Sequence, residues 1–97
     1  MLTATGTGPT STVFVMEQVR QYIIDNFLLG DDSGLDSAES LLDSGIIDST
    51  GIMDVVAFLE SRFGVTVEDE DLIADNLDSV RRIAGFVERK LAAQKAA

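Results

Sequence analysis

The clearest structural pattern in the chain lies in residues 45–77, GIIDSTGIMDVVAFLESRFGVTVEDEDLIADNL. From residue 49 onward, apolar side chains recur every three or four positions, which is the period of an amphipathic helix. Asp48 and Ser49 are suited to cap the first turn of such a helix, and Gly64 is suited to end it. We therefore predict a helix over residues 49–63 whose apolar face consists of Ile52, Val56, Leu59 and Phe63, with Met53 and Val55 beside it.

A long loop is expected before this helix. Residues 30–48 are rich in Gly, Asp and Ser, which favour turns. The loop also contains the apolar residues Leu35, Leu41, Leu42, Ile46 and Ile47. A long loop with apolar side chains is usually packed onto the body of a domain and is often functional. A single helical turn near residues 37–42 is an open alternative.

Another helix is expected before the loop, over residues 13–29. Its apolar face consists of Met16, Val19, Ile23 and Phe27, and Gly30 follows at the position that a left-handed C-cap favours. Residues 1–12 show no periodicity and are rich in Thr, Gly and Ser. They predict a flexible N-terminal extension that ends in a helix cap at Thr10, Ser11 or Thr12.

Two more helices are expected after residue 64. Residues 65–67 form a short extended link, and the acidic residues 68–71 then favour the start of a short helix through its dipole. Its apolar residues are Leu72, Ile73 and Leu77. Asp78 or Ser79 caps a last helix whose apolar face consists of Val80, Ile83, Val87 and Leu91. The predicted fold is all-α, a four-helix bundle with one short helix and a long loop between its first two helices, in one domain over residues 13–97.

Composition excludes several classes of function. The chain has 97 residues, 45% of them apolar, and it contains no His and no Cys. The missing residue types remove the Ser-His-Asp and Cys-His nucleophile systems and the usual zinc ligand sets. The net charge of −10 argues against a direct nucleic-acid partner. No run reaches the roughly 18 apolar residues of a membrane span, and no signal peptide is recognisable, so we expect a cytoplasmic monomer that does not bind membranes.

The charge is unevenly distributed along the chain. Residues 25–78 contain fifteen acidic residues and a single basic one, Arg62, whereas residues 79–97 contain five basic residues and one acidic one. This pattern favours a basic protein partner that is attracted electrostatically, although solvated helix faces are the simpler alternative. The acidic clusters at residues 31–34 and 69–71 lack the glycine spacing of a calcium loop, so no metal site is predicted.

The pair Asp48-Ser49 would by itself indicate only a helix cap. With GIID up to position 48 and FGVTVEDED over residues 63–71, however, residues 41–87 resemble an acyl carrier protein. The resemblance implies that the Ser49 hydroxyl takes up a phosphopantetheine arm from coenzyme A. It also implies that a phosphopantetheinyl transferase with its metal performs the transfer, and that the chain itself is not an enzyme. Asp48 either orients that enzyme or its ion, or caps the helix.

The physical chemistry of these residues agrees with the resemblance. The first turn of a helix offers unpaired N–H groups and partial positive charge to a phosphate. No His or neighbouring Lys is present to activate Ser49, so the transfer chemistry belongs to a partner. The absence of Cys is consistent with a prosthetic arm that supplies the thiol for a thioester.

Four further residues are candidates for partner docking. Asp54 and Glu60 present carboxylates to basic patches on loading and processing enzymes, and Thr50 and Ala57 stand where many fatty-acid carriers have Leu and Met. These smaller residues favour a specialised lipid or polyketide-type pathway over general fatty acid biosynthesis. An aminoacyl, peptidyl or D-alanyl carrier is the first alternative, and an unmodified acidic helical interaction module is the second. The larger apolar residues are predicted to belong to the core: Met16, Met53, Phe14, Phe27, Phe58, Phe63 and Phe86.

Overall fold

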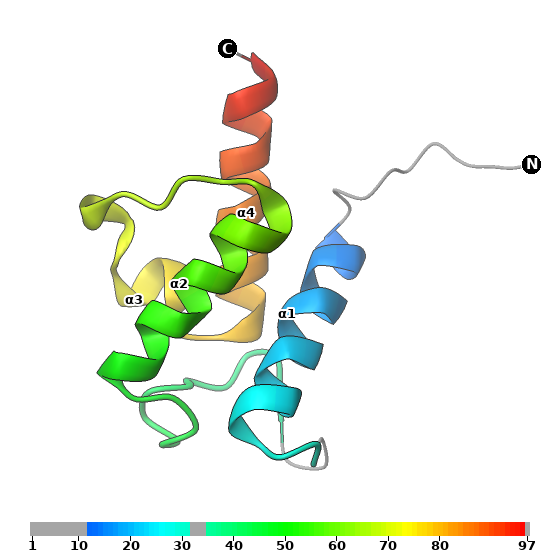
Figure 1. Ribbon diagram of the computed structural model, residues 1–97, viewed down its shortest axis with the longest axis vertical. Coiled ribbons are helices and arrows are strands. Elements are labelled where there is room, and N and C mark those ends of the chain that lie inside the picture. Colours follow the sequence, from blue (N-terminus) through cyan, green and yellow to red (C-terminus); the bar gives the residue numbers. More distant parts are fainter. Residues whose placement is uncertain (1–11, 32–34, 97) are drawn as a thin grey trace, which may run out of the picture.

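The computed structural model describes residues 12–31 and 35–96. These residues form four α-helices and a short 3-10 helix, and none of them lies in a strand. In chain order the elements are α1 (Thr12–Phe27), α2 (Ser49–Phe63), η2 (Asp69–Asp71), α3 (Ala74–Leu77) and α4 (Val80–Ala96) (Figure 1). The prediction of an all-α fold with one short helix and a long first loop is confirmed. Residues 1–11 of the predicted extension lie outside the described residues, and Thr12 already belongs to α1.

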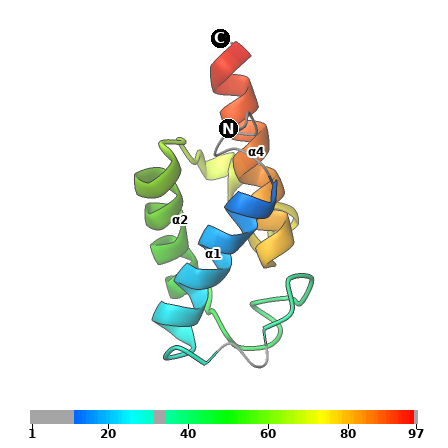
Figure 2. The same cartoon turned by 90° about the vertical axis from the view of Figure 1, so that its right-hand side faces the viewer.

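The helices pack around α4. Both α1 and α3 run against it, and the long loop passes beneath the ends of α1 and α2 (Figures 1 and 2). Most residues of the predicted apolar faces are buried, including Val19, Ile23, Leu59, Ile83 and Val87. None of the described helices is long and apolar enough to cross a membrane.

The prediction that Met53 belongs to the core is wrong. Its side chain is 53% exposed, because the buried face of α2 is formed by Val55, Val56 and Leu59. Among the phenylalanines, only Phe86 is fully buried. The other predicted core residues of this group pack at the edge of the core with part of their surface exposed: Met16, Phe14, Phe27, Phe58 and Phe63.

The end of α1 differs from the prediction. The helix stops at Phe27, two residues before the predicted end. Leu29 and Gly30 then both adopt positive φ angles, 54° and 87°, and the Gly30 N–H donates to the Ile24 carbonyl at 2.9 Å. Glycine accepts this conformation without strain, but a leucine does not. The Leu29 side chain is also 95% exposed, so no packing interaction offsets that strain.

The acidic segment after α2 forms two short elements instead of one. Residues 69–71 make a 3-10 turn, and the helix restarts only at Ala74. The turn is closed by the Glu68 N–H, which donates to Asp71 Oδ2 at 2.9 Å. Because the Asp71 side chain folds back on the start of its own turn, the predicted continuous helix is interrupted at Leu72.

Candidate functional site

Ser49 is the first residue of α2, and its side chain is exposed. Asp48 precedes it in an extended conformation and acts as the helix cap, with Oδ1 accepting from the Gly51 N–H at 2.7 Å. The Asp48 carbonyl accepts from the Ile52 N–H at 3.0 Å. The capping role expected for Asp48 is therefore confirmed. The N–H groups of Ser49 and Thr50 have no acceptor within the helix and lie beside the Ser49 hydroxyl.

Close packing explains why residue 51, in the first turn of α2, is a glycine. A Cβ atom at this position would lie 2.9 Å from Cε1 of Phe27, which is too short for a real side chain, and 3.0 Å from Cγ2 of Ile47, which is tighter than most real contacts. The missing side chain therefore lets the end of α1 and the end of the loop pack against the turn that carries Ser49. This close approach offsets the lower helix propensity of glycine.

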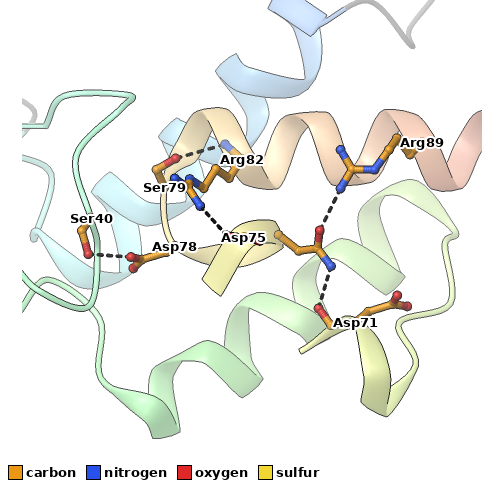
Figure 3. A network of polar contacts seen from close by, with 8 residues as sticks. Ser40, Asp71, Asp75, Asp78, Ser79, Arg82 and Arg89 are labelled. Atoms are coloured by element: carbon orange, nitrogen blue, oxygen red, sulfur yellow. Dashed lines mark hydrogen bonds and ion pairs between the residues drawn. The ribbon is translucent and has the colours of Figure 1, made fainter. Parts of the chain in front are cut away.

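Asp78 holds the loop that leads to Ser49. Its Oδ2 accepts from the Ser40 hydroxyl at 2.7 Å, its Oδ1 from the Leu42 N–H at 3.0 Å, and its carbonyl from the Leu41 N–H at 2.7 Å (Figure 3). Ser79, which is buried, caps α4 by accepting from the Arg82 N–H at 3.1 Å. Of the two predicted caps, Ser79 performs that role and Asp78 binds the loop.

The loop is packed onto the body of the domain, as its apolar residues predicted. Leu35, Leu41 and Ile47 are buried, and the Ile47 N–H donates to the Leu41 carbonyl at 3.1 Å. Residues 37–42 do not form a helix; turns lie at residues 37–38 and from residue 41 onward. The loop thus brings Asp48 and Ser49 to the start of α2 in a defined position.

One side of α2, which we call the α3 side, contains a small apolar cleft. Its volume is about 80 Å³. Leu42, Leu72 and Ile73 at this cleft are partly exposed. The cleft is lined by Leu42, Ile52, Leu72, Ile73, Ala74 and Leu77. Ile52 lies one turn after Ser49, so the cleft lies close to the hydroxyl.

The short elements on the α3 side are held to α4 by polar contacts. Lys90 Nζ lies 2.7 Å from Asp71 Oδ2, and Arg89 donates to Asn76 Oδ1 at 2.8 Å (Figure 3). Arg82 and Asp75 form a more exposed pair at 3.1 Å. The hydrogen bond from Lys90, helped by the one from the Glu68 N–H, lowers the pKa of Asp71 below its ordinary value.

The opposite side of α2, the α1 side, contains a wider groove. The rings of Tyr22 and Phe58 stack there with centroids 4.0 Å apart, and the Tyr22 hydroxyl donates to the Asp54 carbonyl at 3.2 Å. This α1–α2 groove, of about 470 Å³, is lined by Tyr22, Asn26 and Phe27 of α1 and by Asp54, Ala57, Phe58 and Ser61 of α2.

The predicted docking residues do not all lie together. Asp54 and Ala57 both line the α1–α2 groove, and Thr50, one turn before Asp54, is exposed at the start of the same helix face. Glu60 lies elsewhere, with Oε2 accepting from the Val67 N–H at 2.9 Å. Sequence reasoning assigned no role to Tyr22, because its contact with α2 joins residues far apart in the chain.

These residues fit a covalently attached phosphopantetheine. The Ser49 hydroxyl is exposed, the adjacent N–H groups suit the phosphodiester, and an apolar cleft lies within one turn. Over the described ranges no three His, Cys, Asp or Glu side chains are placed to hold a metal ion. When bound, the arm supplies the thiol that the composition of the chain lacks.

Comparison with known proteins points to the same group. Residues 17–87 match the family described as "Phosphopantetheine attachment site". The chain is 36% identical to an acyl carrier protein of Thermotoga maritima over 69 residues, 71% of this chain and 83% of that protein. It is 32% identical over 68 residues to the probable acyl carrier protein PigG of a Serratia species, 70% and 78% of the two chains.

A third relative is an acyl carrier protein of Solidesulfovibrio magneticus, with 30% identity over 81 residues, 78% of this chain and 94% of the relative. The matched region begins inside α1 and ends inside α4, so it includes Ser49, the long loop and both sides of α2. The chain therefore belongs to the acyl carrier protein family, whose members carry phosphopantetheine as a covalently bound prosthetic group.

Proposed function

We propose that Ser49 is the attachment residue and that the chain carries acyl intermediates as thioesters on its phosphopantetheine arm. The observation that carries the proposal is the exposed Ser49 hydroxyl at the first residue of α2, directly after the Asp48 cap. In the attachment, Ser49 Oγ bonds to phosphorus of coenzyme A while the diphosphate bond breaks. The adenosine half leaves, and the hydroxyl proton passes to a base of the transferase. The chain itself contributes position and no catalysis.

The N–H groups at the start of α2 support this assignment. Those of Ser49 and Thr50 have no intrahelical acceptor, and N–H groups of this kind suit a phosphate. The helix dipole adds partial positive charge there. Asp48 does not compete for these groups, because its carboxylate is bound to the Gly51 N–H.

Mass spectrometry tests the attachment. Incubation with coenzyme A and a phosphopantetheinyl transferase is expected to add one phosphopantetheine, and Ser49→Ala is expected to abolish the addition. Ser61→Ala is the matched control, because Ser61 is another exposed serine of α2. Modification that persists in Ser49→Ala would exclude Ser49, and no modification of the natural chain would favour the unmodified interaction module.

We further propose that the partners are enzymes of a specialised pathway. Thr50 and Ala57 are exposed on α2, so small side chains stand where general fatty-acid carriers often present large apolar ones. Burial of a Leu or Met side chain contributes about 1.5–3 kcal/mol, so two missing contacts make general fatty-acid enzymes poor partners. An aminoacyl carrier is the alternative within the family.

A fatty-acid ketosynthase tests this second step. The loaded natural chain is expected to be turned over slowly, and the double variant Thr50→Leu with Ala57→Met is expected to gain about tenfold or more in kcat/KM, the factor that about 1.4 kcal/mol represents. Full turnover of the natural chain, or no gain in the double variant, would return the protein to general fatty-acid metabolism.

A further inference from the structure

Asp78 is the point at which the loop before α2 is fastened to the rest of the fold. Its carboxylate accepts from the Ser40 hydroxyl (Figure 3) and from the Leu42 N–H, and its carbonyl accepts from the Leu41 N–H. Within the described ranges, every hydrogen bond that joins residues 40–47 to α3 or α4 ends on this one residue. The loop therefore depends on Asp78 for its polar attachment to these helices.

Asp78 is itself held firmly between two helices. Leu77 before it and Ser79 after it are buried, and its own N–H donates to the Ala74 carbonyl at 3.0 Å. Because Ser79 caps α4, the Asp78 carboxylate is not needed for that helix. It forms no ion pair with a described residue either. Both hydrogen bonds of the carboxylate within the described part of the chain therefore serve the loop.

The anchored segment leads directly to the serine at the start of α2. The Leu41 carbonyl accepts from the Ile47 N–H at 3.1 Å, which closes the loop into a compact unit. Ile47 is buried and directly precedes the Asp48 cap, so its position sets where Asp48 and Ser49 begin the helix. Because residues 42–45 in between are exposed, hydrogen bonds rather than packing hold this part of the loop.

We propose that Asp78 is a positioning residue for the attachment of phosphopantetheine. By holding the loop before binding, it presents Asp48 and Ser49 in the conformation that the transferase binds. A loop that is already ordered loses less conformational entropy when an enzyme binds it. Asp78 acts through the loop, so its loss weakens binding of the chain to the transferase more than it slows the chemical step. The proposal rests on the proposed function, in which Ser49 is the attachment residue.

The kinetics of attachment test this role, with the unmodified chain, coenzyme A and a phosphopantetheinyl transferase. Asp78→Ala is expected to raise KM for the chain about fivefold or more and to leave kcat within about twofold, the pattern of an interaction made equally in the ground state and the transition state. Asp78→Asn is expected to keep both constants within about twofold, because its amide oxygen accepts from the Leu42 N–H and its NH₂ group donates to the Ser40 hydroxyl.

Two further variants separate positioning from stability. Ser40→Ala removes the bond between its hydroxyl and the carboxylate and is expected to raise KM about two- to threefold. Val87→Ala is the matched control, because it removes a buried side chain of α4 but none of the hydrogen bonds at Asp78. It is expected to lower stability and to leave KM within about twofold. All variants are measured at a temperature at which circular dichroism shows them folded, and hydrogen exchange is expected to show faster opening of residues 40–42 in Asp78→Ala but not in Val87→Ala.

Three outcomes would overturn the proposal: an unchanged KM in Asp78→Ala, an equal rise of KM in Val87→Ala, or an Asp78→Asn variant as impaired as Asp78→Ala. Mass spectrometry of the natural chain separates this failure from failure of the proposed function. A chain that is modified at Ser49 with the same KM in every variant excludes only the positioning role, whereas a chain that is not modified at Ser49 excludes the proposed function.

Discussion

The two sides of α2 are built from different interactions. On the α1 side, a helix of 16 residues packs through Val15, Val19 and Ile23, and stacked aromatic rings cover its contact with α2. On the α3 side, a helix of four residues buries only Leu77, while charged side chains tie it and η2 to α4. Short elements with few buried apolar contacts open at low free-energy cost. We therefore expect the α3 side to open at a lower free-energy cost than the α1 side.

This difference suits the two tasks of a carrier. The cleft has a volume of about 80 Å³, so we expect that a long acyl chain could enter it only if α3 and η2 moved. A partner enzyme, by contrast, benefits from a surface that is already ordered before binding. We therefore propose that cargo enters on the α3 side and that partner enzymes dock on the α1 side.

The largest expected effect is the loss of the loop contact at Asp78. Asp78→Ala removes the acceptor of the Ser40 hydroxyl and the Leu42 N–H. Hydrogen bonds to a charged group contribute about 1.5–3 kcal/mol each. The bond from Ser40 is partly buried and the one from the Leu42 N–H is exposed, so we expect the free energy of unfolding to fall by about 2–4 kcal/mol. Urea denaturation measures this change.

Asp75→Ala provides the comparison, since it removes only an exposed pair with Arg82 and is expected to cost at most about 1 kcal/mol. If the two variants lost equal stability, the loop would not depend on Asp78. Hydrogen exchange should also show faster opening of residues 40–42 in Asp78→Ala and unchanged protection in α1.

The next effect tests the α1 side at Gly51. Alanine is the better helix former by about 1 kcal/mol, yet its Cβ would lie 2.9 Å from the Phe27 ring. Overpacking of this kind costs about 1–3 kcal/mol, so we expect Gly51→Ala to destabilise the fold. The matched control is Gly85→Ala in α4, where the nearest atom is the end of a flexible arginine at 3.6 Å. A stabilised Gly51→Ala variant would show that the α1 side adapts easily and is no more rigid than the α3 side.

Local signals in the sequence were sufficient to predict α2 and its caps. The period of residues 49–63, the Asp48 cap and Gly64 are all contained in one short stretch, and the structure has the same boundaries. The contacts that place this stretch are not local. Asp78 binds Ser40, 38 residues away, and Tyr22 contacts the Asp54 carbonyl across 32 residues. No periodicity encodes such pairs, because they depend on how the helices pack.

Two local predictions failed for physical reasons that the sequence does not display. Met53 was predicted beside the apolar face together with Val55, but the structure buries Val55 and leaves Met53 exposed. The acidic run at 68–71 favours a helix start, but the Asp71 side chain closes a tighter turn and pairs with Lys90 of α4. In both places tertiary contacts outweigh the local preference.

A smaller effect concerns the polar contacts of the α3 side at low pH. The pKa of Asp71 is lowered in the folded protein, chiefly by the hydrogen bond from Lys90. A lowered pKa contributes stability that is present above the unfolded pKa, near 3.9, and is lost as the pH falls through the folded pKa. We therefore expect protection of the amides of residues 71–77 against hydrogen exchange to decrease below about pH 4.

Lys90→Gln is expected to lower this protection at neutral pH and to flatten its dependence on acid. Arg82→Gln, which leaves the Asp71–Lys90 pair in place, is expected to keep the acid dependence of the natural chain. An identical acid response in Lys90→Gln would mean that the pair does not hold η2 and α3 to α4.

The smallest effect is expected at the end of α1, where Leu29 is strained. A non-glycine residue in left-handed geometry destabilises the folded state by roughly 1–2 kcal/mol. Glycine removes this strain, but the larger conformational entropy of its unfolded chain cancels part of the gain in stability. We expect Leu29→Gly to raise the free energy of unfolding by about 0.5–1 kcal/mol, because the leucine side chain is 95% exposed and loses no packing. Leu28→Gly is the control: its side chain packs against the core, so the same change there should destabilise. Thermal denaturation distinguishes the two. A destabilised Leu29→Gly variant would show that this leucine contributes to the α1 side through a contact that outweighs its strain.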